Sequence, residues 1–231
     1  MGPSPNCGPR RGGVRPSLVV IHFTAMKSAE AARARLCDPA AEVSAHWLID
    51  GAGIVEALVP EALRAWHAGA GAWGAARDVN SASIGIELAN DGKSPFPARQ
   101  MAALEALLAG VMGRWGIGPA GVIGHSDMAP ARKVDPGPRF DWKRLARGGL
   151  SVWPEAGEPG DFRADCRGFG YPDVADDLLL RAFRLRFRPW GAGGLDDADR
   201  AVAAGLRVWH ATAGSDAARR DGPAGAADRK V

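Results

Sequence analysis

Residues 17–25 read SLVVIHFTA, and this stretch decides the fold. An uninterrupted apolar run rich in β-branched residues is typical of a strand buried inside a sheet. His22 stands near the end of the run, and open α/β sheets place their ligand sites beyond the carboxyl ends of their strands. The run therefore predicts a central strand that carries an imidazole to one edge of the sheet.

Strands and helices alternate on the C-terminal side of this run. We expect further strands at 43–49, 54–59, 83–89 and 121–124, and helices at 28–36, 97–115 and 142–147. The turn residues DGAG at 50–53 predict an antiparallel hairpin. A long loop is expected over 60–82, and such loops are often functional. The pattern predicts an α/β fold, with a mixed central β-sheet flanked by helices.

The chain beyond this domain changes in character. Residues 154–161, PEAGEPGD, have the composition of a linker. Helical patterns follow at 174–187 and 195–209. The predicted organisation is an N-terminal coil over 1–16, the α/β domain over 17–152, a linker over 153–161, a small C-terminal three-helix module over 162–212 and a disordered tail over 213–231.

Composition and charge exclude several classes of protein. The 231 residues are 46% hydrophobic and 24% charged, which is typical of a globular protein. The net charge of +3 is dispersed, so we expect no nucleic-acid partner. The sequence contains no run of 18 apolar residues, so we expect no membrane span. Cys7, Cys37 and Cys166 are too scattered for a disulfide framework or a zinc knuckle.

Two of the five histidines stand at strand ends. His22 and His125 each follow an apolar strand, and Asp135 comes ten residues after His125. Two imidazoles and one carboxylate suit zinc, with a fourth position left for water. The spacing alone also fits ordinary structural histidines, so from the residues by themselves both interpretations stay open.

Five sequence blocks narrow this choice: SLVVIHFTA, VSAHWLI, RAWHAG, SIGIELAN and GHSDMAPARKVDPGPRFDW. In this order and spacing they resemble the successive motifs of the zinc-dependent N-acetylmuramoyl-L-alanine amidases. That group includes the AmpD and AmiD enzymes and is related in fold to phage lysozyme-like amidases and peptidoglycan recognition proteins. The resemblance covers roughly residues 15–145 and identifies the α/β domain as a zinc amidase domain.

The resemblance implies a set of site residues. The family's Zn²⁺ ligands fall on His22, His125 and Asp135, its catalytic carboxylate on Glu87 and its catalytic lysine on Lys133. Such a carboxylate can move a proton from water to the leaving amine, and such a lysine can stabilise the oxyanion.

The chain departs from some phage-type relatives at one position. They carry a catalytic tyrosine before the histidine of the second strand, where this chain has Ala45. Its single tyrosine, Tyr171, lies in the C-terminal module, so we expect Glu87 to carry the proton transfer. We expect His46 to be structural rather than a metal ligand.

The expected substrate contacts are less distinctive. The resemblance suggests that His67 lines the substrate cleft, and Arg77 and Asn90 are candidates for contacts with the stem peptide. The C-terminal module resembles a small peptidoglycan-binding domain, through AFRLRFRP and GGLDDADRAVAAGL.

The sequence thus predicts zinc-dependent hydrolysis of the amide between N-acetylmuramoyl, in its ordinary or 1,6-anhydro form, and L-alanine of the peptidoglycan stem peptide. The alternatives are a non-catalytic peptidoglycan-binding protein and a hydrolase of another N-acyl peptide. No apolar stretch of signal-peptide length follows Arg10 and Arg11, which favours the cytoplasm, while the wall-binding-like module favours the periplasm or cell wall. The expected partner is peptidoglycan or a muropeptide; a monomer is favoured, with the oligomeric state left open.

Overall fold

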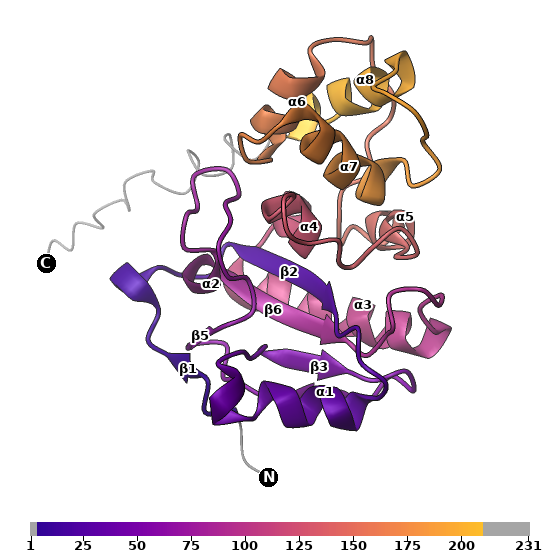
Figure 1. Ribbon diagram of the computed structural model, residues 1–231. Helices are drawn as coiled ribbons and strands as arrows, with labels where there is room; N and C mark the ends of the chain where they lie inside the picture. Colours follow the sequence, from indigo (N-terminus) through magenta and orange to yellow (C-terminus); the bar gives the residue numbers. More distant parts are fainter. Residues whose placement is uncertain (1–3, 210–231) are drawn as a thin grey trace, which may run out of the picture.

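The computed structural model of the protein describes residues 4–209 and is shown in Figure 1. The predicted tail at 213–231 and the last residues of the predicted module, 210–212, lie outside the described residues. His210 lies outside them as well.

A mixed sheet of five strands forms the centre of the molecule. Its strands are, in spatial order, β4 (Val55–Ala57), β3 (Trp47–Ile49), β6 (Ser83–Leu88), β2 (Leu18–Phe23) and β7 (Val122–Gly124). β2 runs parallel to both of its neighbours, β6 and β7, and the β3–β4 hairpin is antiparallel. This sheet confirms the predicted fold class and places the 17–25 run at its centre.

Helices cover both faces of the sheet and extend beyond it (Figure 1). The α-helices are α1 (Ala29–Leu36), α2 (Val79–Ala82), α3 (Ala98–Trp115), α4 (His125–Met128), α5 (Trp142–Arg147), α6 (Phe162–Phe169), α7 (Asp176–Phe187) and α8 (Asp197–Ala204). Short 3₁₀ turns lie at Arg11–Gly13, Pro39–Ala41 and Pro119–Gly121.

The alternation of side chains along β2 divides the core in two. Val19 and Ile21 face the apolar stripe of α3, which includes Leu104 and Leu108. Leu18 and Val20 point to the opposite face and pack with the C-terminal helices. His22 continues this second set, so the same alternation places its side chain on the face away from α3.

Two predicted irregular segments contain more structure than expected. The loop at 60–82 includes the strand β5 (Arg64–Ala65) and the helix α2. The N-terminal coil includes the strand β1 (Cys7–Gly8), which pairs antiparallel with β5. Neither strand is longer than two residues, too short for an alternating pattern to show in the sequence.

The C-terminal helices share a core with the sheet. Phe183 and Phe187 of α7 belong to the same buried cluster as Val20 and Ile123. The segment predicted as a linker is fixed against α8, because the Gly157 N–H donates to the Ala201 carbonyl at 2.8 Å. The module therefore packs as part of one body with the α/β domain, and α4 and α5 lie between the sheet and α6–α8 in Figure 1.

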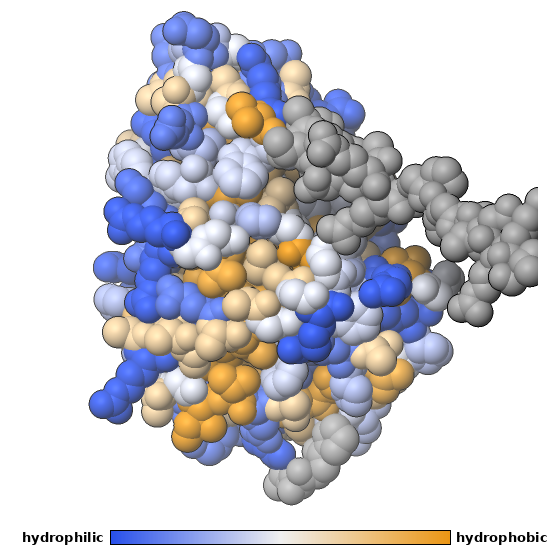
Figure 2. All heavy atoms as spheres, turned by 180° about the vertical axis from the view of Figure 1, so that it is seen from behind, coloured by the Kyte–Doolittle hydropathy of each residue, from blue (hydrophilic) through white to orange (hydrophobic). Residues whose placement is uncertain are grey.

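The outer surface mixes polar and apolar side chains, as the rear view in Figure 2 shows. Apart from the neighbours Ile54 and Val55, the large apolar side chains that are exposed in the described residues are scattered along the sequence: Val14, Val134, Trp190, Leu195 and Val208. Among the described residues, no helix combines the length and the apolarity needed to cross a bilayer.

Candidate metal and catalytic site

The site is built at the carboxyl ends of two neighbouring strands. His22 of β2 and Glu87 of β6 are paired in the parallel register, one residue before each strand ends. Ile84, Ile86 and Leu88 of β6 face α3, so Ser83, Gly85 and Glu87 face the side of His22. Strand register alone thus brings an imidazole and a carboxylate to one edge of the sheet.

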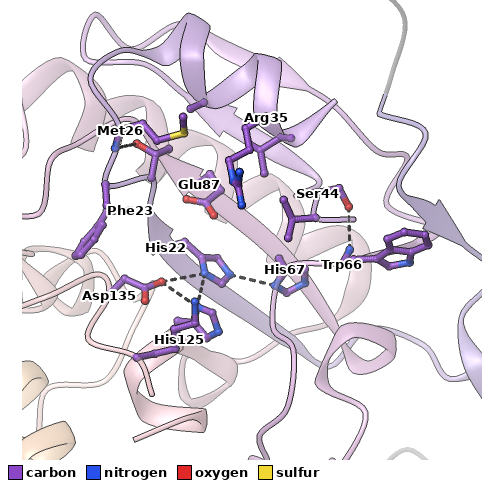
Figure 3. A pocket seen from close by; sticks show the side chains of 16 residues that line it. His22, Phe23, Met26, Arg35, Ser44, Trp66, His67, Glu87, His125 and Asp135 are labelled. Carbon is purple, nitrogen blue, oxygen red and sulfur yellow. Dashed lines mark hydrogen bonds and ion pairs between the residues drawn. The ribbon is translucent and has the colours of Figure 1, made fainter. Parts of the chain in front are cut away.

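The next strand and its loop supply two more groups. His125 is the first residue of α4, directly after β7, and Asp135 follows in the loop beyond α4. The Ser126 N–H donates to the Asp135 carbonyl at 2.9 Å, which holds this loop against the start of α4. Figure 3 shows the side chains of His22, His125 and Asp135 converging.

Three donor atoms meet at this point. The Nδ1 atoms of His22 and His125 lie 2.9 Å apart, and each lies 3.0 Å from Oδ2 of Asp135. All three residues are buried. Within residues 4–209 they form the cluster of histidine and acidic side chains that could hold a metal ion.

The hydrogen bond of His125 Nε2 determines that Nδ1 is the ring nitrogen with the free lone pair. Its Nε2 lies 2.9 Å from the carbonyl oxygen of Ala68, which can only accept a hydrogen bond. Nε2 therefore carries the proton, and in the neutral ring Nδ1 turns its lone pair toward Asp135.

A longer chain of hydrogen bonds fixes His22 in the same way. The Ser83 hydroxyl donates to the Val79 carbonyl at 2.5 Å, so it must accept from Nε2–H of His67 at 3.2 Å. Nδ1 of His67 then accepts from Nε2–H of His22 at 3.0 Å. Burial lowers the pKa of His67 well below its ordinary value and that of His22 to about 4, so both rings are neutral.

Both histidines therefore direct lone pairs at a carboxylate. Beside the imidazoles of His22 and His125 the pKa of Asp135 lies below its ordinary value, although burial alone would raise it, so the group is ionised. Three acceptors buried within 3.0 Å of one another repel unless a cation lies among them. Separations of this size can be spanned by one ion with bonds of about 2 Å, so the donor set fits a metal ion.

The position of His67 depends on a glycine. A side chain at Gly85 would place its Cβ 2.4 Å from Cγ of His67, so only glycine lets this ring lie over β6. The backbone of the loop is fixed as well, because Oδ1 of Asn80 accepts from the N–H groups of His67 and Ala68 at 3.0 and 2.8 Å. His67 lines the cavity and also holds His22 in place.

Glu87 and Lys133 line the same cavity of about 300 Å³ as the three donor groups. Oε2 of Glu87 is buried and has no hydrogen-bond partner among the described residues. Burial and the charge of Asp135 raise the pKa of the Glu87 carboxyl to about 8, while the charge of Lys133 opposes this. An unpartnered carboxyl facing a cavity is a candidate for proton transfer.

The other expected positions lie away from the cavity. Arg77 is exposed and donates to the Gly74 carbonyl of its own loop at 2.7 Å. Asn90 accepts from the Gly92 N–H at 2.7 Å and so stabilises its own turn. His46 accepts from the Gly85 N–H at 2.9 Å and lies 3.1 Å from the Leu63 carbonyl, which is the structural role predicted for it.

Sequence reasoning missed two residues of the site. Ser83 ends the hydrogen-bond chain through His67, and Arg35 of α1 lines the cavity. Ser83 faces the site because it is two and four residues before Gly85 and Glu87 on one strand. This alternation was a usable signal, whereas nothing in the sequence places α1 over the site.

The chain resembles proteins of one family. The family model of N-acetylmuramoyl-L-alanine amidases matches residues 12–138. The chain is 36% identical to N-acetylmuramoyl-L-alanine amidase AmiD of Escherichia coli, over 83% of this chain and 82% of that protein. It is 35% identical to 1,6-anhydro-N-acetylmuramyl-L-alanine amidase AmpD of Enterobacter cloacae, over 62% of this chain and 86% of that protein.

A solved structure extends this likeness to the fold. It is the E. coli AmiD complex with anhydro-N-acetylmuramic acid-L-Ala-D-γ-Glu-L-Lys, with a TM-score of 0.76 and 34% identity. The match covers 85% of this chain and 90% of that chain, more than the α/β domain alone. The helical module is therefore part of the shared architecture.

Proposed function

Because the chain belongs to the N-acetylmuramoyl-L-alanine amidase family, we propose that it hydrolyses the amide between N-acetylmuramic acid and L-alanine of the peptidoglycan stem peptide. The observation that carries this proposal is the convergence of His22, His125 and Asp135 beside the unpartnered carboxyl of Glu87. All four side chains line one cavity, which supports the proposal that a metal ion and a proton carrier act there together.

We propose Zn²⁺ as the metal held by His22, His125 and Asp135. Two neutral imidazole nitrogens and one carboxylate oxygen are a donor set of catalytic zinc sites. When bound, Zn²⁺ would polarise the amide carbonyl as a Lewis acid and make water acidic enough to attack near neutral pH. His67 and the Ala68 carbonyl would keep the two imidazoles in the orientation that binding requires.

We propose that Glu87 carries the proton. As the attacking water forms its bond to the lactyl carbonyl carbon, Glu87 accepts a water proton. It then donates that proton to the alanine nitrogen as the C–N bond breaks. A bound dication would favour the ionised form of Glu87, against the burial that raises its pKa to about 8.

We propose that Lys133 stabilises the oxygen that becomes negative during this reaction. Lys133 lines the cavity, and its charge is felt by both Glu87 and His22. A cation fixed at that place lowers the barrier because it interacts more strongly with the negative oxygen of the transition state than with the neutral carbonyl oxygen of the substrate.

The test is hydrolysis of purified muropeptide by the full chain. We expect release of free stem peptide, seen by mass spectrometry, with loss of activity in chelator and recovery on adding Zn²⁺. If the muropeptide binds but no peptide is released with Zn²⁺ restored, the chain is a non-catalytic peptidoglycan-binding protein.

The 1,6-anhydro form is the substrate we propose first. The AmpD relative is named for that form, and the AmiD complex holds an anhydro-muramoyl tripeptide. Parallel assays on soluble anhydro fragments and on intact sacculi measure the preference. Faster release from sacculi would contradict this choice and would favour action on the cell wall.

A further inference from the structure

Arg35 places a positive charge in the wall of the catalytic cavity. It belongs to the last turn of α1, and its side chain reaches into the cavity that Glu87 also lines (Figure 3). Within residues 4–209, no carboxylate lies within 4.0 Å of its guanidinium. No carboxylate in this part of the chain therefore neutralises its charge.

The neighbouring arginine of the same helix turn shows that this arrangement is not general. Arg33 donates from Nε to Oε1 of Glu56 at 2.5 Å, outside the cavity. A helix C-terminus favours cations by its dipole, which accounts for the presence of both arginines. The helix dipole does not explain why Arg33 is paired with Glu56 while Arg35 points into the cavity.

Arg35 is supplied by α1, whereas the groups assigned to the reaction come from strand ends and from the loop after α4. A contact between Arg35 and a part of the substrate beyond the scissile amide would act on substrate binding.

The stem peptide carries a group that matches a guanidinium. In the ligand of the AmiD complex, alanine is followed by a γ-linked glutamate. A γ-linkage uses the side-chain carboxyl, so the α-carboxylate of that residue stays free. From standard backbone dimensions it lies roughly 5–6 Å from the nitrogen of the scissile amide. Arginine pairs with carboxylates through two parallel hydrogen bonds.

Resting on the amidase function above, we propose that Arg35 binds the free α-carboxylate of the γ-linked glutamate and selects stem peptides that carry this charge. Arg35 is thereby a specificity-determining residue, placed by α1 across the cavity from the metal-binding side chains. The other cationic side chain that lines the cavity, Lys133, stabilises the oxygen of the reacting carbonyl.

The experiment compares two muropeptides that differ in one group. One has γ-linked glutamate with its α-carboxylate, and the other has the α-carboxamide. We expect the unmodified protein to favour the carboxylate by roughly tenfold or more in kcat/KM, the range of a charge-assisted hydrogen bond. Arg35→Ala should lose this preference through KM, with kcat, its pH profile and the zinc content unchanged. Arg35→Lys should keep part of it.

Arg33→Ala is the matched control, because it removes a cation from the same turn outside the cavity. It should keep the full preference for the carboxylate. An unmodified protein without preference, or an Arg35→Ala variant with the full preference, would overturn the assignment.

Calorimetric binding of the same two muropeptides to Glu87→Gln separates this inference from the amidase function. If the unmodified protein cleaves neither muropeptide, yet Glu87→Gln binds the carboxylate form more tightly and Arg35→Ala abolishes that difference, the amidase function fails and the role of Arg35 stands. If the unmodified protein cleaves muropeptide and Arg35→Ala changes neither the kinetic preference nor the binding difference, the amidase function stands and the role of Arg35 fails.

Discussion

Two buried polar clusters each take one residue from α4, His125 in the first and Asp127 in the second, and they differ in how their charges are matched. The first is the metal-site cluster, His22, His125 and Asp135, whose three atoms within 3.0 Å are all acceptors. The second, which we call the anchor cluster, is Asp127, Arg186 and Tyr171. In it a carboxylate accepts from Arg186 at 2.8 Å and from Tyr171 at 2.7 Å.

The difference shows that burial of charge does not by itself identify a functional site. In the anchor cluster each acceptor has a donor, and the Arg186 guanidinium also stacks 4.3 Å from the Trp142 ring. The Gly124 N–H donates to Asp127 at 2.8 Å, so the cluster also holds the start of α4. In the metal-site cluster three acceptors face one another, and this arrangement is the feature that predicts a bound cation.

The largest expected effect is at the metal-site cluster. His125→Ala removes one of three metal donors, so turnover of muropeptide should fall to the background rate. The protein should stay folded, because the change relieves repulsion between buried acceptors. Activity and circular dichroism measured together check this, and an unfolded variant would contradict it.

Glu87→Gln should lower kcat by about 10²–10⁴-fold, because general acid–base catalysis contributes that much. Zinc content should be unchanged, since Glu87 is not among the three donor groups. Elemental analysis and steady-state kinetics on the same sample test both statements. An unchanged kcat would remove Glu87 from the reaction.

In the anchor cluster, Arg186→Met should reduce the free energy of unfolding by about 3–5 kcal/mol, because it leaves the buried Asp127 carboxylate unpaired. Denaturant unfolding measures this loss. The double variant Arg186→Met, Asp127→Asn removes the unpaired charge and should recover part of the stability. If the double variant loses as much unfolding free energy as Arg186→Met and Asp127→Asn lose together when made singly, the two residues do not interact directly.

Tyr171→Phe should have the smallest effect, a loss of about 1–3 kcal/mol in unfolding free energy from one hydrogen bond to a charged group. It touches the anchor cluster alone, so zinc content and kcat should not change. A loss of zinc in this variant would mean that the two clusters are not independent.

The sequence predicted the parts of the site that lie at strand ends. The β-branched run ending in His22, and the short strand before His125, could be recognised because buried strands have a clear apolar pattern. Family motifs then selected Asp135, which the structure places beside both histidines. The mixed sheet flanked by helices was predicted in the same way.

The remaining features depend on contacts between distant segments. Nothing near Arg186 in the sequence indicates that it pairs with Asp127, because the two residues come together only when α7 packs on α4. The composition of 154–161 suggested a linker, and in the structure a backbone hydrogen bond from Gly157 to Ala201 ties this segment to α8. Arg77 and Asn90 stay predictions as substrate contacts, since they were chosen by residue type, and in the structure each makes a hydrogen bond within its own turn.

The most direct test of the account is the zinc content of the purified protein. We expect one equivalent of Zn²⁺ per chain by elemental analysis, removed by chelator and regained on titration, in the unmodified protein and in Tyr171→Phe. His125→Ala should contain none. A folded, unmodified protein that neither contains nor takes up zinc, or a His125→Ala variant that binds a full equivalent, would contradict the account.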